Sequence, residues 1–355
     1  MVIPAPERVK AQGMHGAIHL FDRLPQVDVA DQRSPDRPIA TARSEPLVGL
    51  IRNPHSHGNS GSKSRDGDVP GVIVAAPGKR SELPEILADF AAKNVDYIAI
   101  DGGDGTVRDV LTCGASAFGE CWPTLILLPS GKTNALAHDL AIPESWTLAA
   151  ALESASAGKT VDRRPIVVAQ RDNRNAQVRG FVLGAGAYTS AISLGQDAHN
   201  FGAFNAAAVG VTAVWSGLQA FFGGKNNPWR RGTRMRLRTA DGWEIEHAGG
   251  GAFAERYFMF ASTLEHFPAG LRPFRDLEGD IRMAVFDNSR RRLLLRLPVI
   301  FRGKAGDGTR RRGFHTHGLD SFEFDIADRF ILDGEAFPPG HYSVTAGPRL
   351  RFAVP

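Results

Sequence analysis

The chain has 355 residues, which is enough for two domains, and 43% of them are hydrophobic, which supports substantial cores. A charged content of 23% and a formal net charge of +4 are ordinary for a soluble protein. The two cysteines, Cys113 and Cys121, exclude a disulfide framework and lack the spacing of a metal site. A reduced, cytoplasmic setting is therefore expected, and the N-terminus has no apolar run of signal-peptide length that would favour export.

Residues 1–45 are rich in Pro, Arg, Asp and Gln and show no sustained hydrophobic period. We therefore expect a flexible leader, with Met14 as a second candidate start. Regular structure is expected to begin with a short apolar strand at 46–51, which ends at Asn53-Pro54.

Residues 46–161 alternate between apolar runs of strand length and segments with helical spacing. The expected strands are 46–51, 72–76, the run from Ile98 into the glycines at 102 and 103, and 124–128. The expected helices are 81–93, one from about Thr106, 135–140 and 147–157. This alternation predicts an α/β domain with a mostly parallel sheet, whose ligands lie at the carboxyl ends of the strands.

From about Val161 the pattern changes to short strands separated by turn signals. The expected strands are 165–170, 178–183, 235–239, 256–262, 280–286, 322–326 and 330–332. They predict a β-rich domain over 162–340, an antiparallel β-sandwich, with the tail 341–355 as a candidate to return to the first domain. The uncharged, apolar stretch 201–222 is long enough to span a membrane, but its polar residues favour a helix that covers a core or one side of a lipid cleft.

The most informative segment is 98–107, where an apolar run ends in Asp101, two glycines, Asp104, Gly105 and Thr106. Glycines let the backbone approach a ligand, so the N–H groups of 102–106 are expected to face phosphate oxygens, helped by a helix that starts near Thr106. Asp104 is the one charge in the glycine-rich stretch and a candidate for Mg²⁺. The alternative is an ordinary strand–turn–helix connection.

Basic residues concentrate in two clusters, at 229–238 and 290–312. Such clusters suit an anionic membrane surface or an anionic substrate, whereas the alternative is a solvated strand edge. Nucleic acid is disfavoured because no aromatic residues are interleaved at base-stacking intervals.

Two pairs of histidines stand at alternate positions, His55 with His57 and His315 with His317. Such pairs can bind Zn²⁺ when a third ligand converges on them. No third ligand is evident, so solvent-exposed loop histidines are expected.

Four short blocks, in order along the chain, resemble the diacylglycerol kinase catalytic-domain family of lipid kinases, whose relatives include sphingosine and ceramide kinases. Asn53-Pro54 is similar to the family's first-strand motif, and Gly102-Gly-Asp-Gly-Thr106 matches its phosphate-binding signature. Pro129-Ser-Gly-Lys-Thr-Asn134 resembles a second nucleotide loop, and Leu332-Asp-Gly-Glu335 resembles the motif that supplies the catalytic base. The resemblance extends over residues 46–355.

The resemblance implies a nucleotide-binding α/β domain like those of phosphofructokinases and NAD kinases, followed by the lipid-substrate domain. It implies ATP and Mg²⁺, Glu335 as the base that accepts the lipid hydroxyl proton, and Asp162 as a second acid that meets and orients Glu335. Asp104 is implied to act on Mg²⁺, and a second, structural Mg²⁺ is a candidate at Asp276 and Glu278. The implied nucleotide-binding residues are Asn53, Pro54, Gly102, Gly103, Asp104, Gly105, Thr106, Gly131, Lys132, Thr133 and Asn134.

The chain departs from the family's pattern at Lys132, where the family has Thr, and at Ala135, where it has Asp. The activity that the resemblance implies is an ATP-dependent kinase acting on the primary hydroxyl of diacylglycerol or a similar lipid, at the cytoplasmic face of an anionic membrane. A ceramide or sphingoid-base kinase, a soluble-substrate kinase of the NAD-kinase kind and a non-catalytic nucleotide or lipid sensor remain alternatives. The lipid acceptor and a homo-oligomeric state stay open.

Overall fold

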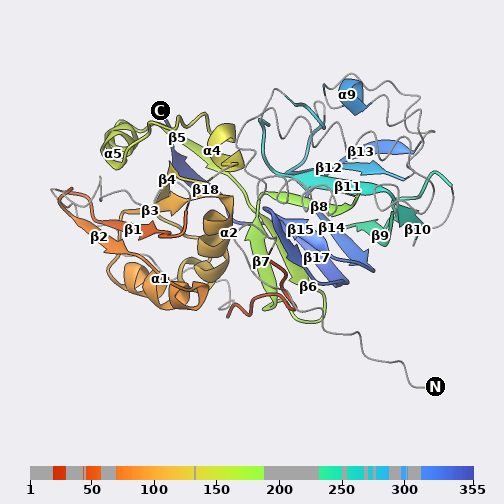
Figure 1. Cartoon of the computed structure of the whole chain (residues 1–355), viewed down its shortest axis with the longest axis horizontal. Coiled ribbons are helices and arrows are strands. Elements are labelled where there is room, and N and C mark those ends of the chain that lie inside the picture. The colour runs from red at the N-terminus through yellow and green to blue at the C-terminus, as the bar shows by residue number, and fades with distance from the viewer. Residues whose placement is uncertain are drawn as a thin grey trace.

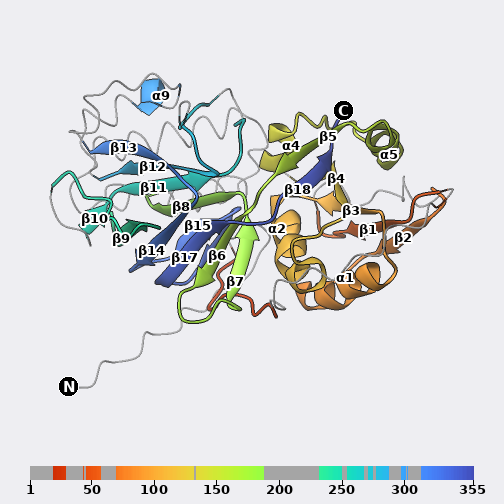
Figure 2. The ribbon, with the colours of Figure 1, turned by 180° about the vertical axis from the view of Figure 1, so that it is seen from behind.

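The computed structural model describes residues 19–28, 43, 45–56, 69–131, 133–187, 232–249, 254–267, 271–274, 277–287, 297–300, 302 and 313–355. They form an α/β part and a β-rich part, which lie side by side in both views of the ribbon (Figures 1 and 2). The two parts meet where helix α2 (Asp104–Cys113) packs on strand β7 (Gln177–Gly180). At this boundary the backbone N–H of Arg179 donates to Thr112 Oγ1 over 3.0 Å.

The α/β part is built on a six-stranded sheet in the order β2-β1-β3-β4-β18-β5. Its strands are β1 (Val48–Arg52), β2 (Val72–Ala75), β3 (Tyr97–Gly102), β4 (Thr124–Pro129), β5 (Thr160–Arg163) and β18 (Leu350–Ala353). All neighbouring pairs are parallel except β18 with β5. The chain therefore leaves this sheet after β5 and returns to it only with its last strand.

Both faces of this sheet are buried, which explains why its strands read as continuous apolar runs. Along β3, Ile98 and Ile100 face one core while Ala99 faces the other, as the period of a strand requires. The first face is covered by α1 (Leu83–Ala92), α2, α3 (Ala115–Phe118) and α4 (Ala135–Asp139), and the second by α5 (Leu148–Ser156). A single 3₁₀ turn, η1 (Arg80–Glu82), precedes α1.

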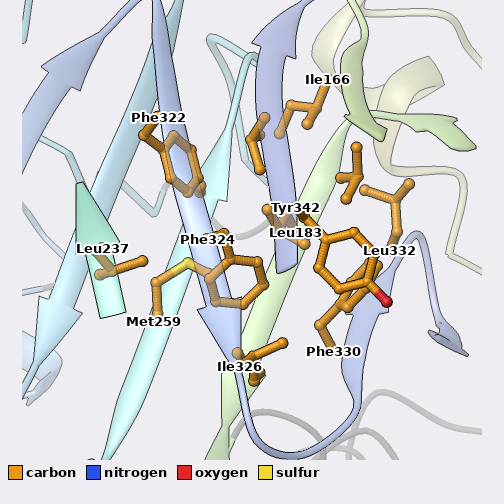
Figure 3. Close-up of a cluster of buried hydrophobic side chains, with 14 of the residues drawn as sticks. Ile166, Leu183, Leu237, Met259, Phe322, Phe324, Ile326, Phe330, Leu332 and Tyr342 are labelled. Atoms are coloured by element: carbon orange, nitrogen blue, oxygen red, sulfur yellow. The ribbon is translucent and has the colours of Figure 1, made fainter. Parts of the chain in front are cut away.

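The β-rich part consists of two antiparallel six-stranded sheets. The first sheet runs β10-β9-β14-β17-β6-β7, with β6 (Ile166–Gln170), β9 (Thr233–Thr239), β10 (Ala254–Arg256), β14 (Ser321–Ile326) and β17 (Gly340–Ala346). The second runs β13-β12-β11-β8-β15-β16, with β8 (Val182–Gly186), β11 (Phe258–Ser262), β12 (Ile281–Phe286), β13 (Phe314–Leu319), β15 (Phe330–Leu332) and β16 (Glu335–Phe337). One core lies between the sheets, with Phe324 and Tyr342 of the first against Leu183 and Phe330 of the second (Figure 3).

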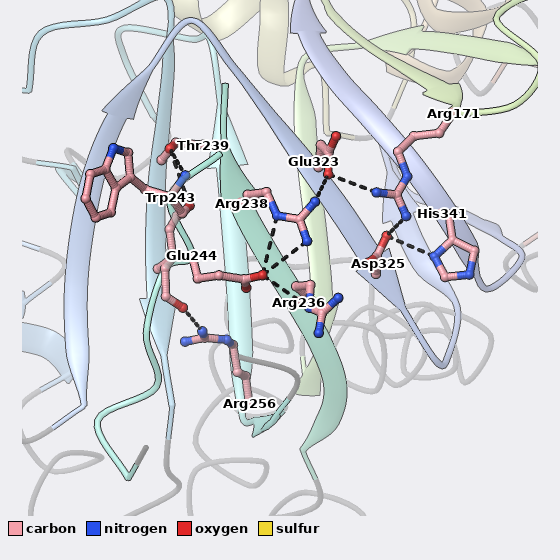
Figure 4. A network of polar contacts seen from close by, with 11 residues as sticks. Arg171, Arg236, Arg238, Thr239, Trp243, Glu244, Arg256, Glu323, Asp325 and His341 are labelled. Atoms are coloured by element: carbon pink, nitrogen blue, oxygen red, sulfur yellow. Dashed lines mark hydrogen bonds and ion pairs between the residues drawn. The ribbon is translucent and has the colours of Figure 1, made fainter. Parts of the chain in front are cut away.

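The outer faces of the two sheets differ. On the first sheet, Arg238 pairs with Glu323 at 2.7 Å and with Glu244 at 3.1 Å, and Arg171 pairs with Asp325 at 2.6 Å (Figure 4). This is a solvated face whose charges are balanced between neighbouring strands. The second sheet carries an outer aromatic layer of Phe258, Phe260, Phe267, Phe274, Phe286 and Phe314, beside the short helix α9 (Leu297–Ile300).

The expected fold class is confirmed at the level of an α/β part with a mainly parallel sheet followed by antiparallel sheets. The apolar stretch 201–222 and most of the cluster 290–312 lie outside the described residues. Among the helices that are described, none combines the length and hydropathy needed to cross a membrane.

The expectation of a wholly flexible leader is wrong for residues 19–28. Leu24 is only 1% exposed and belongs to the core between the two antiparallel sheets. A hydrophobic period arises where a helix or a long strand buries one face. This segment forms neither and is held by individual tertiary contacts, so it shows no such period. We name residues 19–28 the N-terminal segment.

Replacing Leu24 by Ala should lower the free energy of unfolding by about 2–5 kcal/mol, because it empties a buried leucine site. Leu20→Ala is the matched control: Leu20 is 55% exposed, so a change within about 0.5 kcal/mol is expected. Urea denaturation of the two variants measures both. Equal stability of Leu24→Ala and wild type would show that the N-terminal segment is not part of the core.

Candidate active site

Two glycine loops meet backbone to backbone at the carboxyl ends of β3 and β4. A Cβ added at Gly103 would lie 2.9 Å from the Cα of Gly131, and one added at Gly131 would lie 2.5 Å from the Cα of Gly103. Distances this short exclude any side chain at either position. The sequence therefore needs glycine at both sites to bring the loop after β3 against the loop after β4.

Two asparagines brace these loops. Asn134 has a left-handed backbone (φ 48°), and its side chain both accepts from the N–H of Gly131 at 3.1 Å and donates to the carbonyl of Gly131 at 2.8 Å. Asn53, after β1, donates from Nδ2 to Thr106 Oγ1 at 2.8 Å. Both act within the protein, so they shape the site instead of offering free amides to a ligand.

The loop after β1 is also tied to the loop after β4. Ser56 Oγ donates to the carbonyl of Ser130 at 2.9 Å, and Ser130 Oγ lies 2.9 Å from Ser56 Oγ. Pro54 lies between Asn53 and this contact. The loops near 53–56, 102–106 and 130–134 therefore converge, while Lys132 lies outside the described residues.

Helix α2 begins at Asp104, two residues earlier than expected. The N–H of Thr106 already donates to the carbonyl of Gly103 at 2.9 Å, so the expectation that all N–H groups of 102–106 stay free is wrong. The N–H groups of the first helical turn at Asp104 and Gly105 are those that a helix leaves for an external acceptor. The start of α2 remains suited to an anion.

The carboxylate of Asp104 caps the next helix. Oδ2 accepts from the N–H of Ala135 at 2.9 Å, and Oδ1 accepts from the N–H of Leu136 at 3.2 Å. Burial raises the pKa of Asp104, and these two hydrogen bonds partly offset that effect. Ala135 thus contributes its backbone N–H to the position of this carboxylate.

A tight hairpin delivers the proposed base to the boundary between the two parts. Asp333 and Gly334 both have positive φ (45° and 83°), as a two-residue turn between antiparallel strands requires. The carboxylate of Asp333 accepts from the N–H of Phe181 at 3.0 Å and of Val182 at 2.9 Å. Glu335 then follows as the first residue of β16.

Arg108 joins the glycine loop to this hairpin. Its side chain is 3% exposed, its Nη1 lies 4.0 Å from Glu335 Oε1, and its Nη2 donates to Asp109 Oδ1 at 2.9 Å. A Cβ on Gly105 would touch the Arg108 guanidinium at 3.8 Å. This cation therefore lies between the start of α2 and Glu335.

The charges of this group act on one another. Burial alone would lower the pKa of Arg108, but Asp109, Glu335 and Asp333 outweigh it and raise that pKa. Burial raises the pKa of Glu335, and Arg108 partly offsets the rise. Burial and the nearby Asp104 raise the pKa of Asp333 to about 7. The loops and the hairpin thus share one electrostatic environment.

The predicted meeting of Asp162 with Glu335 is not observed among the described contacts. Asp162 lies on β5, opposite Arg351 of β18, and its Oδ1 is 3.6 Å from Arg351 Nε. The charges that act on Glu335 come from Arg108, Asp109 and Arg80. The register of β5 on β18 explains the difference, because it pairs Asp162 with Arg351 within the α/β sheet.

The candidate second metal site is not supported by the residues that are described. Glu278 is exposed, Asp276 lies outside the described residues, and nearby Asp280 pairs with Arg164 at 2.7 Å. Within the described ranges, no three Asp, Glu, His or Cys residues gather in a way that could hold a metal ion.

The expectation of exposed loop histidines is wrong for His315 and His317. Both lie on β13, and His315 is buried, with Nε2 3.0 Å from Asp287 Oδ2 and Nδ1 2.9 Å from His317 Nε2. Asp287 also forms a buried ion pair with Arg256. These histidines belong to a structural polar network. His55 is exposed and His57 lies outside the described residues.

A second link between the two parts comes from Asp139, which the motifs did not single out. Its carboxylate accepts from Arg163 Nε at 2.6 Å and from the N–H groups of Glu265 and His266 at 2.8 and 2.6 Å. This ties α4 to the loop after β11. Like Arg108, Asp139 is a charged residue on an otherwise apolar helix face. A charge at such a position is a sequence signal for a buried polar contact.

Residues 49–166 match the family model of the diacylglycerol kinase catalytic domain. The match extends over about a third of the chain. The matched range contains Asn53 and the loops at 102–106 and 130–134, whereas the hairpin with Glu335 lies outside it. The curated proteins compared with the chain yield no match.

Solved structures share the fold over most of the chain. A proposed diacylglycerol kinase from Bacillus anthracis str. Sterne has 16% sequence identity and a TM-score of 0.59, and the match covers 88% of this chain and 98% of that one. A diacylglycerol kinase structure from the same strain has 15% identity and a TM-score of 0.57 over the same shares. At such identities the likeness concerns the fold alone.

Asp333 makes the stability of the metal-free protein depend on pH. Its folded pKa of about 7 exceeds the ordinary value of 3.8, so the folded state binds the extra proton and stability falls as pH rises from about 4 to 7. The size of this pKa shift limits the loss of unfolding free energy over this pH range to at most about 4 kcal/mol. In Asp333→Asn, the free energy of unfolding between these pH values should vary much less than in wild type. An identical pH dependence in chelator-treated samples of both proteins would contradict the assignment.

Proposed function

We propose that this protein is an ATP-dependent kinase that phosphorylates the primary hydroxyl of diacylglycerol or a similar lipid. The observation that carries the proposal is the joint position of Glu335 and the glycine loops, with buried Arg108 between them. A phosphate cradle without a nearby base would fit a sensor, and a base without a cradle would fit many hydrolases. The match of residues 49–166 to the diacylglycerol kinase catalytic-domain model supports the proposal of a kinase.

The nucleotide is proposed to bind where Gly103 meets Gly131. The absence of side chains there leaves room for phosphate oxygens, and the amino-terminal end of α2 favours their negative charge. Asn53 and Asn134 keep the loops in shape through their hydrogen bonds to Thr106 and Gly131. Phosphoryl transfer depends mainly on such positioning and on charge neutralisation.

In the proposed reaction, the lipid hydroxyl oxygen forms a bond to the γ-phosphorus while the bond from that phosphorus to the ADP oxygen breaks. The hydroxyl proton passes to the carboxylate of Glu335 as the new bond forms. Arg108 favours the ionised form of Glu335, which partly offsets the effect of burial on its pKa. The same cation would oppose the negative charge of the transferred group.

Asp104 fits a Mg²⁺ ion that takes most of its ligands from phosphates and water, because such sites use only one or two carboxylates. Bound there with ATP, directly or through water, the ion would supply charge neutralisation. The two N–H donors of α4 keep the Asp104 carboxylate in a fixed orientation at the loops.

The lipid chains are proposed to lie along the outer aromatic layer of the β-rich part. Phe258, Phe260 and Phe267 are only partly buried and offer apolar surface. Phe267 packs against this layer and also against the core of the α/β part, and Asp139 holds the adjoining residues 265 and 266 to α4. An acyl chain on this layer would thus lie next to the nucleotide side of the molecule.

Association with an anionic membrane surface is proposed to rest on the basic cluster 290–312. In the other cluster, Arg236 and Arg238 already pair with Glu244 and Glu323, so they contribute less net charge to a surface. Each free Lys or Arg near an anionic membrane adds about 1 kcal/mol.

Glu335→Gln should abolish the transfer of labelled phosphate from ATP to diacylglycerol, with a loss of about 10²–10⁴-fold, because the amide cannot accept the proton. Glu153→Gln, an exposed substitution on α5, is the control and should keep full activity. The assay uses mixed micelles with diacylglycerol, ceramide or sphingosine, and circular dichroism verifies folding. Full activity of Glu335→Gln would remove this residue as the base.

The same labelled-ATP assay, extended to NAD and fructose 6-phosphate as acceptors, separates the alternatives. Phosphorylation of NAD or fructose 6-phosphate without any lipid product would identify a soluble-substrate kinase. ATP binding with no transfer to any acceptor would identify a nucleotide sensor. Lys132 and Ala135, which differ from the pattern of the kinase family, are the residues that favour this alternative. Both outcomes would overturn the lipid kinase proposal.

A further inference from the structure

The N-terminal segment lies along the edge of the second antiparallel sheet and forms an isolated β-bridge with it. Leu20 pairs with Ala336 in a parallel bridge. The N–H of Phe21 donates to the carbonyl of Ala336 at 2.8 Å, and the N–H of Ala336 donates to the carbonyl of His19 at 3.1 Å. The segment therefore covers part of the edge of β16, directly beside Glu335.

This segment is anchored along its length. The N–H of Gln177 donates to the carbonyl of Pro25 at 3.0 Å, and the N–H of Val27 donates to the carbonyl of Asn175 at 2.7 Å. Arg329 Nη1 donates to the carbonyl of Phe21 at 2.7 Å, and Leu24 is buried in the main core. Because releasing it would expose core surface, the segment is a permanent part of the fold and not a detachable lid.

The ring of Phe21 lies against the groups around Glu335. It stacks on Phe337 with 4.8 Å between ring centroids. The guanidinium of Arg80 lies 4.9 Å from its centroid and that of Arg108 lies 5.8 Å away. Phe21 thus restricts the two cations that act on Glu335.

The hydrogen bonds between Ala336 and residues 19 and 21 place the backbone of His19 beside Glu335, and the N–H of His19 lowers the pKa of the Glu335 carboxyl. The other charged groups that act on this carboxylate are Arg108 and Asp109 of α2 and Arg80 of η1. In the part of the chain that is described, Oε2 of Glu335 and Nη1 of Arg108 have no hydrogen-bond partner.

We propose that the N-terminal segment is a positioning element of the active site, which fixes the carboxylate of Glu335 through the N–H of His19 and restrains Arg108 through the ring of Phe21. The inference rests on the proposed role of Glu335 as the base. A hydrogen bond to the carboxylate favours its ionised form, the form in which it accepts a proton. The segment supports the reaction and does not inhibit it.

A proline at position 19 tests the N–H directly, because proline has no backbone donor but keeps the carbonyl that pairs with Ala336. Leu20→Ala keeps every backbone donor and carbonyl of the segment, changes an exposed side chain, and is the control. With diacylglycerol micelles and Mg-ATP, His19→Pro should lower kcat by about ten- to hundredfold, the strength of a hydrogen bond to a charged group, with the KM for ATP unchanged. The acidic limb of its pH profile should move to higher pH, because the lost N–H lowered the pKa of Glu335. Leu20→Ala should match wild type.

Wild-type kcat and an unmoved acidic limb in His19→Pro would overturn the inference, and so would a rise in activity, which would make the segment inhibitory. Should His19→Pro fail to fold, Phe21→Ala, which keeps the backbone ladder, is expected to lower kcat in the same direction, and wild-type kcat there would equally overturn it. An inactive wild type would count against the proposed function instead. In that case, carboxyl NMR titration of Glu335 in full-length wild type and His19→Pro still decides, since the pKa must be higher in the variant.

Discussion

The contact between Gly103 and Gly131 is the constraint on which the candidate site depends. Two backbones can come this close only where neither residue has a side chain, and the contact brings the loop after β3 to the loop after β4. The Ser56–Ser130 hydrogen bond then adds the loop after β1. A larger residue at either glycine would separate the loops and remove the place proposed for the phosphates.

The second requirement is that the two parts of the chain stay in register at this point. Strand β18 returns to the α/β sheet, Asp139 holds residues 265 and 266 to α4, and Arg108 reaches from α2 to Glu335. These buried charged contacts carry a cost of desolvation that is offset only when their partners are in place. Such contacts favour one arrangement of the two parts over others, which suits a site made from both.

The sequence predicts those features that depend on local chemistry. The continuous apolar runs of β1, β3 and β4 and the Asp333-Gly334 turn are properties of neighbouring residues, so their elements could be predicted. Asp162 could not be placed this way, because its partner Arg351 is set by the pairing of β5 with the distant β18. The prediction for residues 19–28 failed for the same reason. These residues have no hydrophobic period of their own and are held by contacts with β16 and the β6–β7 turn. The prediction of an exposed loop at His315 was wrong because residues 314–319 form the strand β13, which was not expected from the sequence.

The most direct test of the central claim is a crystal structure of the full chain with a non-hydrolysable ATP analogue and Mg²⁺. We expect the phosphates to lie against Gly103, Gly105 and Gly131, with the γ-phosphate facing Glu335 across a gap that one hydroxyl group can fill. A nucleotide bound elsewhere, or phosphates at the loops with Glu335 turned away from them, would contradict it.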